Sequence, residues 1–241
     1  MISVILTAYN AEKYIQQAIE SIINQTYKDW ELIVVEDGST DGTFEKLMDS
    51  RWKDDYNLSD LNMVIVRSAE NVGHTKSLNK ALMVAKGEYI AWQDADDISE
   101  PHRFEEQLKC FTKNVGIVTT CGIAINDNGD RVKDWYCDKG QRRTELEIKI
   151  NSETDWWCMG PSMMFKREVV EKIGGFDEEC YYCQDYNFWL RTIEEFDWKV
   201  CGMELYRLRR HKGSVRKNKK AGEKNWGTFA YERAKICPIV K

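Results

Sequence analysis

Short apolar, β-branched runs alternate with segments of helical periodicity over the first hundred residues. Strands are predicted at Ser3–Ala8, Trp30–Glu36, Met63–Arg67 and Glu88–Gln93. Helices are predicted between them at Glu12–Asn24, Thr43–Asp49 and Lys76–Ala85. Strands that are apolar along most of their length need cover on both faces, as in parallel sheets. The pattern therefore predicts an α/β domain with a mostly parallel central sheet flanked by helices.

The pattern changes after Pro101. Strands are predicted at Val115–Asn126 and Arg131–Tyr136, paired as a hairpin, at Ser162–Phe165, and as one or two short strands within Trp198–Leu208. Helices are predicted at Arg103–Lys113, Arg142–Ile150, Asp185–Phe196 and Gly222–Ala234. The chain has only three Pro and no Ser/Gly-rich spacer. We therefore expect one continuous domain with two functional halves.

Composition narrows the class of protein. A chain of 241 residues is long enough for one full-sized domain, and its net charge of −5 argues against a general nucleic-acid binder. Basic residues cluster between Arg207 and Lys220, where they could meet phosphates, an anionic membrane face, or only solvent. No stretch approaches the roughly 18 apolar residues of a membrane span, and the start lacks the features of a signal peptide.

The number and spacing of the cysteines indicate the cellular compartment of the protein. Eight Cys with irregular spacing and no secretion signal favour reduced thiols, so a cytoplasmic protein is expected, with peripheral membrane contact left open. Cys180-x-x-Cys183 is a lone pair, whereas a zinc ribbon needs a second pair or two histidines at suitable spacing.

An acidic cluster follows the fourth predicted strand. Asp94, Asp96 and Asp97 place three carboxylates within four residues. Such groups repel each other and lose hydration at the end of a buried strand, so they call for a compensating charge. Mg²⁺ or Mn²⁺ is the obvious one, because these ions bind one or two carboxylates and fill their other positions with water and phosphate oxygens. The cluster therefore predicts a metal-assisted site for a phosphorylated substrate.

Other polar residues follow the remaining strands, where ligands of parallel sheets bind. Tyr9 lies just past the first strand, where its ring could stack on a nucleobase or simply line the rim. Asp37 follows the second strand and could accept a hydrogen bond from a base. Asn71 belongs to a loop expected beside the nucleotide.

Five motifs recur in a recognisable order. They are Val4-Ile5-Leu6-Thr7-Ala8-Tyr9-Asn10, the run from Gln25 to Thr43, Asn71-Val72-Gly73 with Ser77 to Ala81, the cluster Asp94 to Asp97 with Pro101 and Arg103, and Ile173 to Glu178 before Gln184 to Arg191. Over about residues 1 to 215 the chain resembles glycosyltransferase family 2, the inverting nucleotide-sugar transferases. The resemblance implies a GT-A fold, a single Rossmann-like domain with a smaller acceptor-side sheet. It divides the chain into a nucleotide-binding half (1–98), an acceptor-binding half (99–215) and a basic C-terminal segment with a helix (216–241).

The resemblance also assigns roles on the donor side. It implies that Thr7, Tyr9, Asp37 and Asn71 line the nucleotide site, and that Asp94 faces the ribose or the metal. Asp96 is implied to coordinate the ion that bridges the diphosphate. Asp97 either reaches the donor sugar or caps the turn.

On the acceptor side, Asp185 matches the family's catalytic aspartate. Inversion needs in-line attack by an acceptor hydroxyl, which is a poor nucleophile without a general base. The family more often has Glu-Asp, whereas this chain has Gln184-Asp185, which puts acceptor contacts in doubt rather than the base. A helix N-cap is the alternative role for Asp185. Trp189 and Arg191 follow at helical spacing, and packing is favoured over acceptor contact for Trp189.

Two further segments complete the implied site. Gly160 lies where the family has a loop near the donor sugar, and Trp156 and Trp157 before it could stack on a pyranose or be buried. Arg209, His211 and Ser214 resemble the family's Arg-x-His-x-x-Ser element. His211 could contact the pyrophosphate or complete the metal shell, although a lone His is more often structural. The basic stretch could act as a lid.

The resulting hypothesis is a Mn²⁺- or Mg²⁺-dependent inverting glycosyltransferase that uses a nucleoside-diphosphate sugar, with UDP expected. Its acceptor would be a glycan or a lipid-linked sugar. A nucleotidyltransferase is one alternative, but Thr7-Ala8-Tyr9-Asn10 is not the Gly-rich basic phosphate loop that such an enzyme carries. A non-catalytic nucleotide- or carbohydrate-binding relative is the other. The intact Asp94, Asp96 and Asp185 argue against it.

Overall fold

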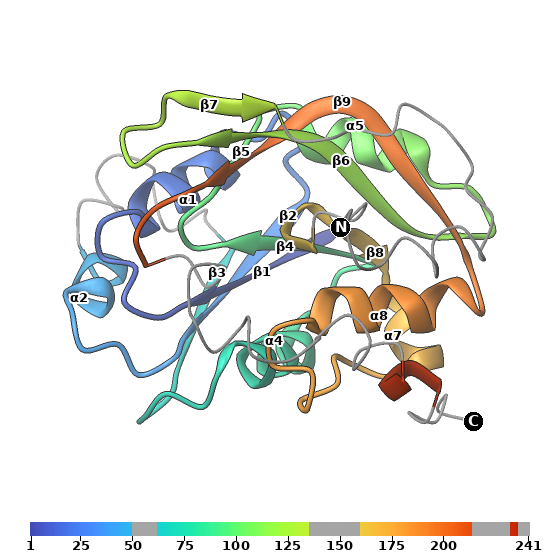
Figure 1. The fold of residues 1–241 in the computed structure, drawn as a ribbon, viewed down its shortest axis with the longest axis horizontal. Coiled ribbons are helices and arrows are strands. Elements are labelled where there is room, and N and C mark those ends of the chain that lie inside the picture. Colours follow the sequence, from blue (N-terminus) through green and yellow to red (C-terminus); the bar gives the residue numbers. More distant parts are fainter. Residues whose placement is uncertain (50–61, 135–159, 214–231, 236–241) are drawn as a thin grey trace.

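A single mixed sheet forms the centre of the protein (Figure 1). The computed structural model describes residues 1–49, 62–134, 160–213 and 232–235. Within them the strands follow the order β3-β2-β1-β4-β8-β6-β9-β5, with β7 beside β6. Their bounds are β1 Ile2–Ala8, β2 Trp30–Glu36, β3 Met63–Arg67, β4 Tyr89–Asp94, β5 Ile98–Ser99, β6 Val115–Ile125, β7 Arg131–Asp134, β8 Met164–Lys166 and β9 Asp197–Arg209.

The pairing of the first four strands confirms the predicted parallel sheet. β1 pairs in parallel with β2 and β4, and β2 pairs in parallel with β3. Both faces of β1 are buried, because Ile5 belongs to one apolar cluster and Val4 and Leu6 to the other. Since parallel strands end at the same edge, the residues after β1, β2 and β4 are brought together there.

Helices cover the two faces (Figure 1). One face packs on α4 His74–Val84, α7 Arg167–Ile173 and α8 Gln184–Ile193, which contribute Leu78, Val169 and Phe188 to its cluster. The other face packs on α1 Ile15–Ile23, α2 Thr43–Leu47 and α5 Arg103–Cys110. α1, α2, α4, α5 and α8 each begin within three residues of their predicted starts, whereas α7 was not predicted from the sequence.

The second half continues the same sheet. β8 is antiparallel to both β4 and β6, so the smaller sheet expected here is the outer part of the central one. The β6–β7 hairpin is confirmed, with a bulge at Ala124–Ile125. β9 is one strand of 13 residues, parallel to β6, rather than a short strand or a pair of them. Gly160–Ser162 forms a 3₁₀ turn before β8.

Several predictions lie outside the described residues. They are the helix at Arg142–Ile150, the roles of Trp156, Trp157 and Ser214, and most of the C-terminal segment, of which residues 232–235 are helical. The expectation of reduced thiols is wrong at Cys121, which is disulfide-bonded, while Cys110, Cys180, Cys183 and Cys201 are free. In the described part of the chain, no helix has the length and apolarity needed to cross a membrane.

Candidate functional site

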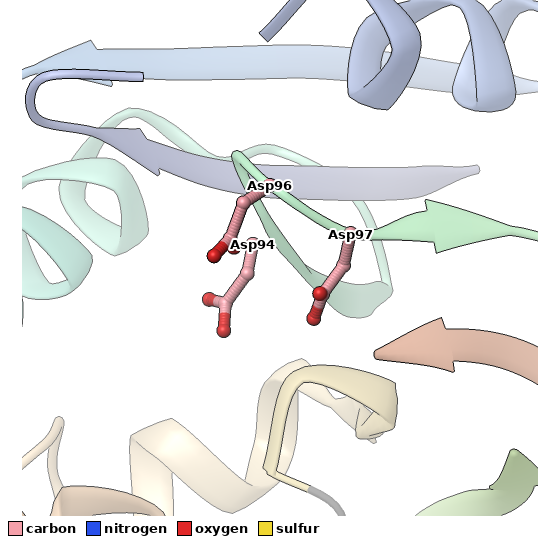
Figure 2. Close-up of side chains that lie close together, drawn as sticks. All are labelled: Asp94, Asp96 and Asp97. Atoms are coloured by element: carbon pink, nitrogen blue, oxygen red, sulfur yellow. The ribbon is translucent and has the colours of Figure 1, made fainter. Parts of the chain in front are cut away.

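The acidic turn after β4 gathers three carboxylates. Asp94 ends the strand, Asp96 and Asp97 follow in the turn, and Figure 2 shows their side chains pointing to the same side of it. One oxygen from each lies within 4.8 Å of the others. Three carboxylates this close, at a partly buried strand end, form the all-oxygen donor set that Mg²⁺ and Mn²⁺ prefer. The residues present therefore fit a hard divalent cation.

Burial perturbs the titration of this turn. It raises the pKa of Asp94 to about 8, and the charge of Asp96 adds to the effect, whereas the indole N–H of Trp92, 2.9 Å from Oδ1, opposes it. Burial also raises the pKa of Asp97 well above its ordinary value. Negative charge on the turn is thus unfavourable without a cation, which is the property expected of a metal or cationic ligand site.

His211 contacts the acidic turn directly. Its Nε2 lies 2.8 Å from Oδ2 of Asp96. The ring also packs on Tyr14, with ring centroids 4.9 Å apart. The fold therefore brings together the two residues that the sequence assigned to the metal, although they are separated by more than a hundred positions.

Arg209 and Asp97 connect the acidic turn to the end of β9. Oδ1 of Asp97 accepts the backbone N–H of Arg209 at 2.7 Å, and Asp97 is only 1% exposed. The Arg209 guanidinium donates to the carbonyls of Asp96, Asn126 and Asp127 and to Oε1 of Gln17. It is 3% exposed. These contacts fix the end of β9 against the turn, and a donor-sugar contact by Asp97 stays a prediction.

The nucleotide-side residues lie along the same edge. Thr7 pairs in register with Asp94. Both oxygens of Asp37 accept backbone N–H groups, from Val72 at 3.0 Å and Gly73 at 2.9 Å, so this carboxylate shapes the loop that carries Asn71. A contact from Asp37 to the base stays a prediction. Asn71 is exposed, and Tyr9 is 49% exposed, which leaves its ring open to a stacking partner.

Asp185 lies beside Gly160, near enough to Asp94 for its charge to affect that carboxylate. It is the second residue of α8, where the N-cap is Cys183, so it is not the helix N-cap, and its Oδ1 accepts the N–H of Tyr186 at 2.8 Å. Its charge is among the causes that raise the pKa of Asp94. Gly160 makes room for it, because a Cβ at position 160 would lie 2.5 Å from Oδ2 of Asp185. Gly160 thus shapes the site through Asp185.

Comparison with known proteins decides the family. The model described as "Glycosyl transferase family 2" matches residues 3–174. This chain belongs to that family. An uncharacterized glycosyltransferase of Methanocaldococcus jannaschii is 34% identical over 212 residues, which are 87% of this chain and 70% of the relative. This glycosyltransferase is therefore a transferase of class EC 2.4, which sets aside the nucleotidyltransferase alternative.

Solved structures show the GT-A fold. S. aureus TarS 1–349 in complex with UDP-GlcNAc gives a TM-score of 0.68 at 22% identity, over 88% of this chain and 59% of that one. The mannosyltransferase PcManGT of Pyrobaculum calidifontis, in complex with GDP-Man and Mn²⁺, gives 0.66 at 23% identity, over 88% of this chain and 58% of that one. The glycosyltransferase thus spans less than two thirds of either protein.

Trp189 packs in the core of the glycosyltransferase. It is 2% exposed, stacks on Tyr186 and meets Trp198 edge-on. A ring with so little free surface has no face left for an acceptor sugar, in agreement with the packing role favoured from the sequence. Arg191 is equally structural, since it is 3% exposed and donates to the carbonyls of Ile173 and Gly175.

Arg103 is a buried cation close to the acidic turn, and no role was predicted for it. It is fully buried and donates to the carbonyls of Trp92, Pro161 and Met163 and to the side chains of Gln93, Ser99 and Gln107. Burial lowers its pKa to about 10, which leaves it charged at neutral pH. The network ties the end of β4 to the turn that carries Gly160.

Replacing Arg103 by Met is expected to lower the free energy of unfolding by about 3–5 kcal/mol, because several buried acceptors would lose their donor. Urea denaturation monitored by circular dichroism measures this. Arg131→Ala is the control, since its exposed pair with Glu204 should contribute less than about 1 kcal/mol. Equal losses in the two variants would contradict the role given to the Arg103 network.

His74 lies beside Thr7, and no role was predicted for it from the sequence. It begins α4, its Nδ1 lies 2.8 Å from Oγ1 of Thr7, and its ring packs on Trp92. Burial lowers its pKa to about 4, so it is neutral at physiological pH. The signal available was its place directly after Asn71-Val72-Gly73, in a loop already expected beside the nucleotide.

The His74 pKa predicts an acid-dependent loss of stability. The unfolded chain takes up a proton on this ring near pH 6.5, whereas the folded chain does so only near pH 4. The contribution of neutral His74 to the free energy of unfolding is therefore complete above pH 6.5 and is lost as the pH falls from 6.5 to 4. Urea unfolding at pH 4.5 and 7.5 should show a smaller acid loss in His74→Gln than in the wild type. His102→Gln, at an exposed position, serves as the control. An unchanged acid loss in His74→Gln would contradict the assignment.

Proposed function

We propose that this glycosyltransferase is metal-dependent and inverting. It moves a sugar from a nucleoside-diphosphate sugar, with UDP as the expected nucleotide, to a hydroxyl of a glycan or lipid-linked acceptor. The observation that carries this is the proximity of two acidic elements: the carboxylates of Asp94, Asp96 and Asp97 cluster after β4, and Asp185 at the start of α8 is near enough for its charge to help raise the pKa of Asp94. The UDP-GlcNAc and GDP-Man complexes of proteins with this fold support a nucleotide-sugar donor.

The two halves take different substrates in this proposal. Residues 1–98 carry Thr7, Tyr9, Asp37 and Asn71 at the strand ends, and they bind the nucleotide. Residues 99–215 carry Asp185 and bind the acceptor. His74 adds a neutral ring beside Thr7, at the point where the nucleotide would lie.

Asp94, Asp96 and His211 would hold the cation. The distance of 2.8 Å between His211 and Asp96 and the clustering of the carboxylates support this set. Mn²⁺ or Mg²⁺, when bound, supplies positive charge that stabilises the leaving nucleoside diphosphate. Arg209 and Asp97 keep the turn in place, and Arg103 holds the strand from behind.

Asp185 acts as the general base. It takes the proton of the acceptor hydroxyl as that oxygen bonds to the anomeric carbon, while the bond from this carbon to the diphosphate oxygen breaks on the opposite face. The configuration inverts, and the electron pair leaves with the nucleoside diphosphate. Gly160 leaves the space in which the Asp185 carboxylate sits.

Calorimetric titration with UDP, GDP, CDP and dTDP, each with Mn²⁺ and with EDTA, tests the donor side of the proposal. Tight binding of one diphosphate that vanishes with EDTA is the expected result. It would also identify the base and so limit the sugar nucleotides to be assayed. Absence of binding for all four would contradict the proposal.

A further inference from the structure

The loop between α7 and α8, residues 174–183, carries the chain into Asp185. It is held from two elements besides its own polypeptide neighbours. Asn79 of α4 accepts the N–H of Phe176 at 2.9 Å and donates to its carbonyl at 2.9 Å. Arg191 of α8 donates to the carbonyl of Gly175 at 2.6 Å. These contacts fix the first part of the loop, and Asn79 reaches the second part only through Oε1 of Glu178, to which it donates at 3.2 Å.

That second part begins at Asp177, which is paired with the C-terminal helix. Nε of Arg233 lies 2.9 Å from Oδ2 of Asp177, and another guanidinium nitrogen lies 3.1 Å from Oδ1. A third nitrogen lies 3.3 Å from Oε2 of Glu179. This is the two-pronged geometry in which arginine holds a carboxylate most firmly. The pair connects two segments more than fifty residues apart.

The carboxylate of Asp177 depends on this partner. Its side chain is 6% exposed, so its charge has little access to water. Burial by itself would raise the pKa of Asp177, but the hydrogen bonds from Arg233 and from the backbone N–H of Glu179 outweigh it and hold the pKa below its usual value. Asp177 also accepts the N–H of Cys180 on its carbonyl, so it starts the turn that leads to α8.

Phe176, the neighbour of Asp177, continues the connection to the donor side. Its ring meets Trp92 edge-on, with centroids 5.3 Å apart, and the indole N–H of Trp92 donates to Asp94. The second part of the loop leads through Cys180 and Cys183, both fully buried, into the helix that carries Asp185. A shift of the loop would therefore move Asp185 relative to Asp94.

We propose that Arg233 is a positioning residue for the transfer step: it fixes Asp177 and, through the loop 174–183, sets the place of Asp185 relative to the donor site. The inference rests on the proposed function, since it gives the loop a reason to be fixed. Arg233 itself touches neither substrate. Its removal should change the rate of the reaction and leave donor binding nearly as it was.

The test compares Arg233→Ala with Glu232→Ala, an exposed position on the same short helix. Diphosphate binding with Mn²⁺ should stay within about twofold of wild type in both. The kcat for hydrolysis of the matching sugar nucleotide should fall roughly tenfold in Arg233→Ala only, with KM within about twofold, because small misplacements of a catalytic group slow the chemical step. Arg233→Lys, which keeps the charge but loses the fork, should recover part of kcat.

Two further measurements separate positioning from general damage. Amide hydrogen exchange in peptides covering 176–183 should quicken in Arg233→Ala and not in Glu232→Ala. Asp177→Asn combined with Arg233→Ala should be no slower than the slower single variant, because both act through one contact. Wild-type kcat in Arg233→Ala, or an equal loss in Glu232→Ala, would overturn the inference while donor binding still supported the proposed function. Failure of wild-type protein to bind any diphosphate would overturn both.

Discussion

Asp96→Ala is expected to abolish the Mn²⁺-dependent part of nucleoside-diphosphate binding. Asp96 belongs to the carboxylate cluster and is the member that His211 contacts, so its removal deprives the cation site of one oxygen donor and of the contact with His211. Loss of a direct ligand should weaken binding by at least about 100-fold, which is the upper range for groups that only support a ligand. Calorimetric titration with the diphosphate that binds wild-type protein, with and without EDTA, measures it.

The control for Asp96→Ala is Asp130→Asn, in the exposed β6–β7 turn, which should bind like wild type. Thermal unfolding of both variants shows that the fold is retained. If Asp96→Ala kept an EDTA-sensitive affinity close to that of the wild type, the acidic turn would not be the metal site.

Asp185→Asn is expected to keep diphosphate binding and to eliminate transfer. The amide has nearly the same shape and still offers an oxygen to the N–H of Tyr186, but it cannot take a proton from the acceptor hydroxyl. Loss of a general base typically lowers the rate by about 10²–10⁴-fold. The measurement is steady-state transfer with the sugar nucleotide identified by diphosphate binding, together with calorimetry of the same variant.

Asp197→Asn, at the exposed start of β9, is the matched control for Asp185→Asn and should transfer at the wild-type rate. Gly160→Ala should resemble Asp185→Asn in part, because its new methyl group would displace the Asp185 carboxylate. Equal loss of diphosphate binding in Asp96→Ala and Asp185→Asn would contradict the division of roles between the donor and acceptor sides.

Local pattern was enough to predict the first half of the fold. The strands at Trp30–Glu36 and Met63–Arg67 begin and end as predicted, because their apolar runs are bounded by polar turns. The long β9 was harder, since it alternates exposed and buried residues and is held by pairing with β6, which lies about eighty residues earlier. Two-residue β5 exists only because β9 lies beside it, and no local signal marks it.

The residues of the candidate site also fall into two groups, those that could be predicted from the sequence and those that depend on the fold. Asp94 and Asp96 belong to an acidic cluster whose chemistry is readable in the residues themselves, whereas Asp185 was assigned through the resemblance to the family. The roles of Arg209, Arg103 and His74 depend on which acceptors surround them after folding, and these come from distant segments. A charged side chain in a motif can equally hold a ligand or a backbone carbonyl, and only the fold separates the two.

Phe165 of β8 pairs with Ile90 of β4 on one side and with Ile117 of β6 on the other. This short strand therefore joins β4 to β6 by pairing with both, so neither of these strands has a free edge there. Exchange of residues 1–98 between glycosyltransferases, as a route to hybrid enzymes, would have to preserve the packing and register on both sides of Phe165. We therefore expect that exchange of one half will disturb the other half as well as change donor preference. Hybrids should tolerate swapped surface loops better than swapped halves.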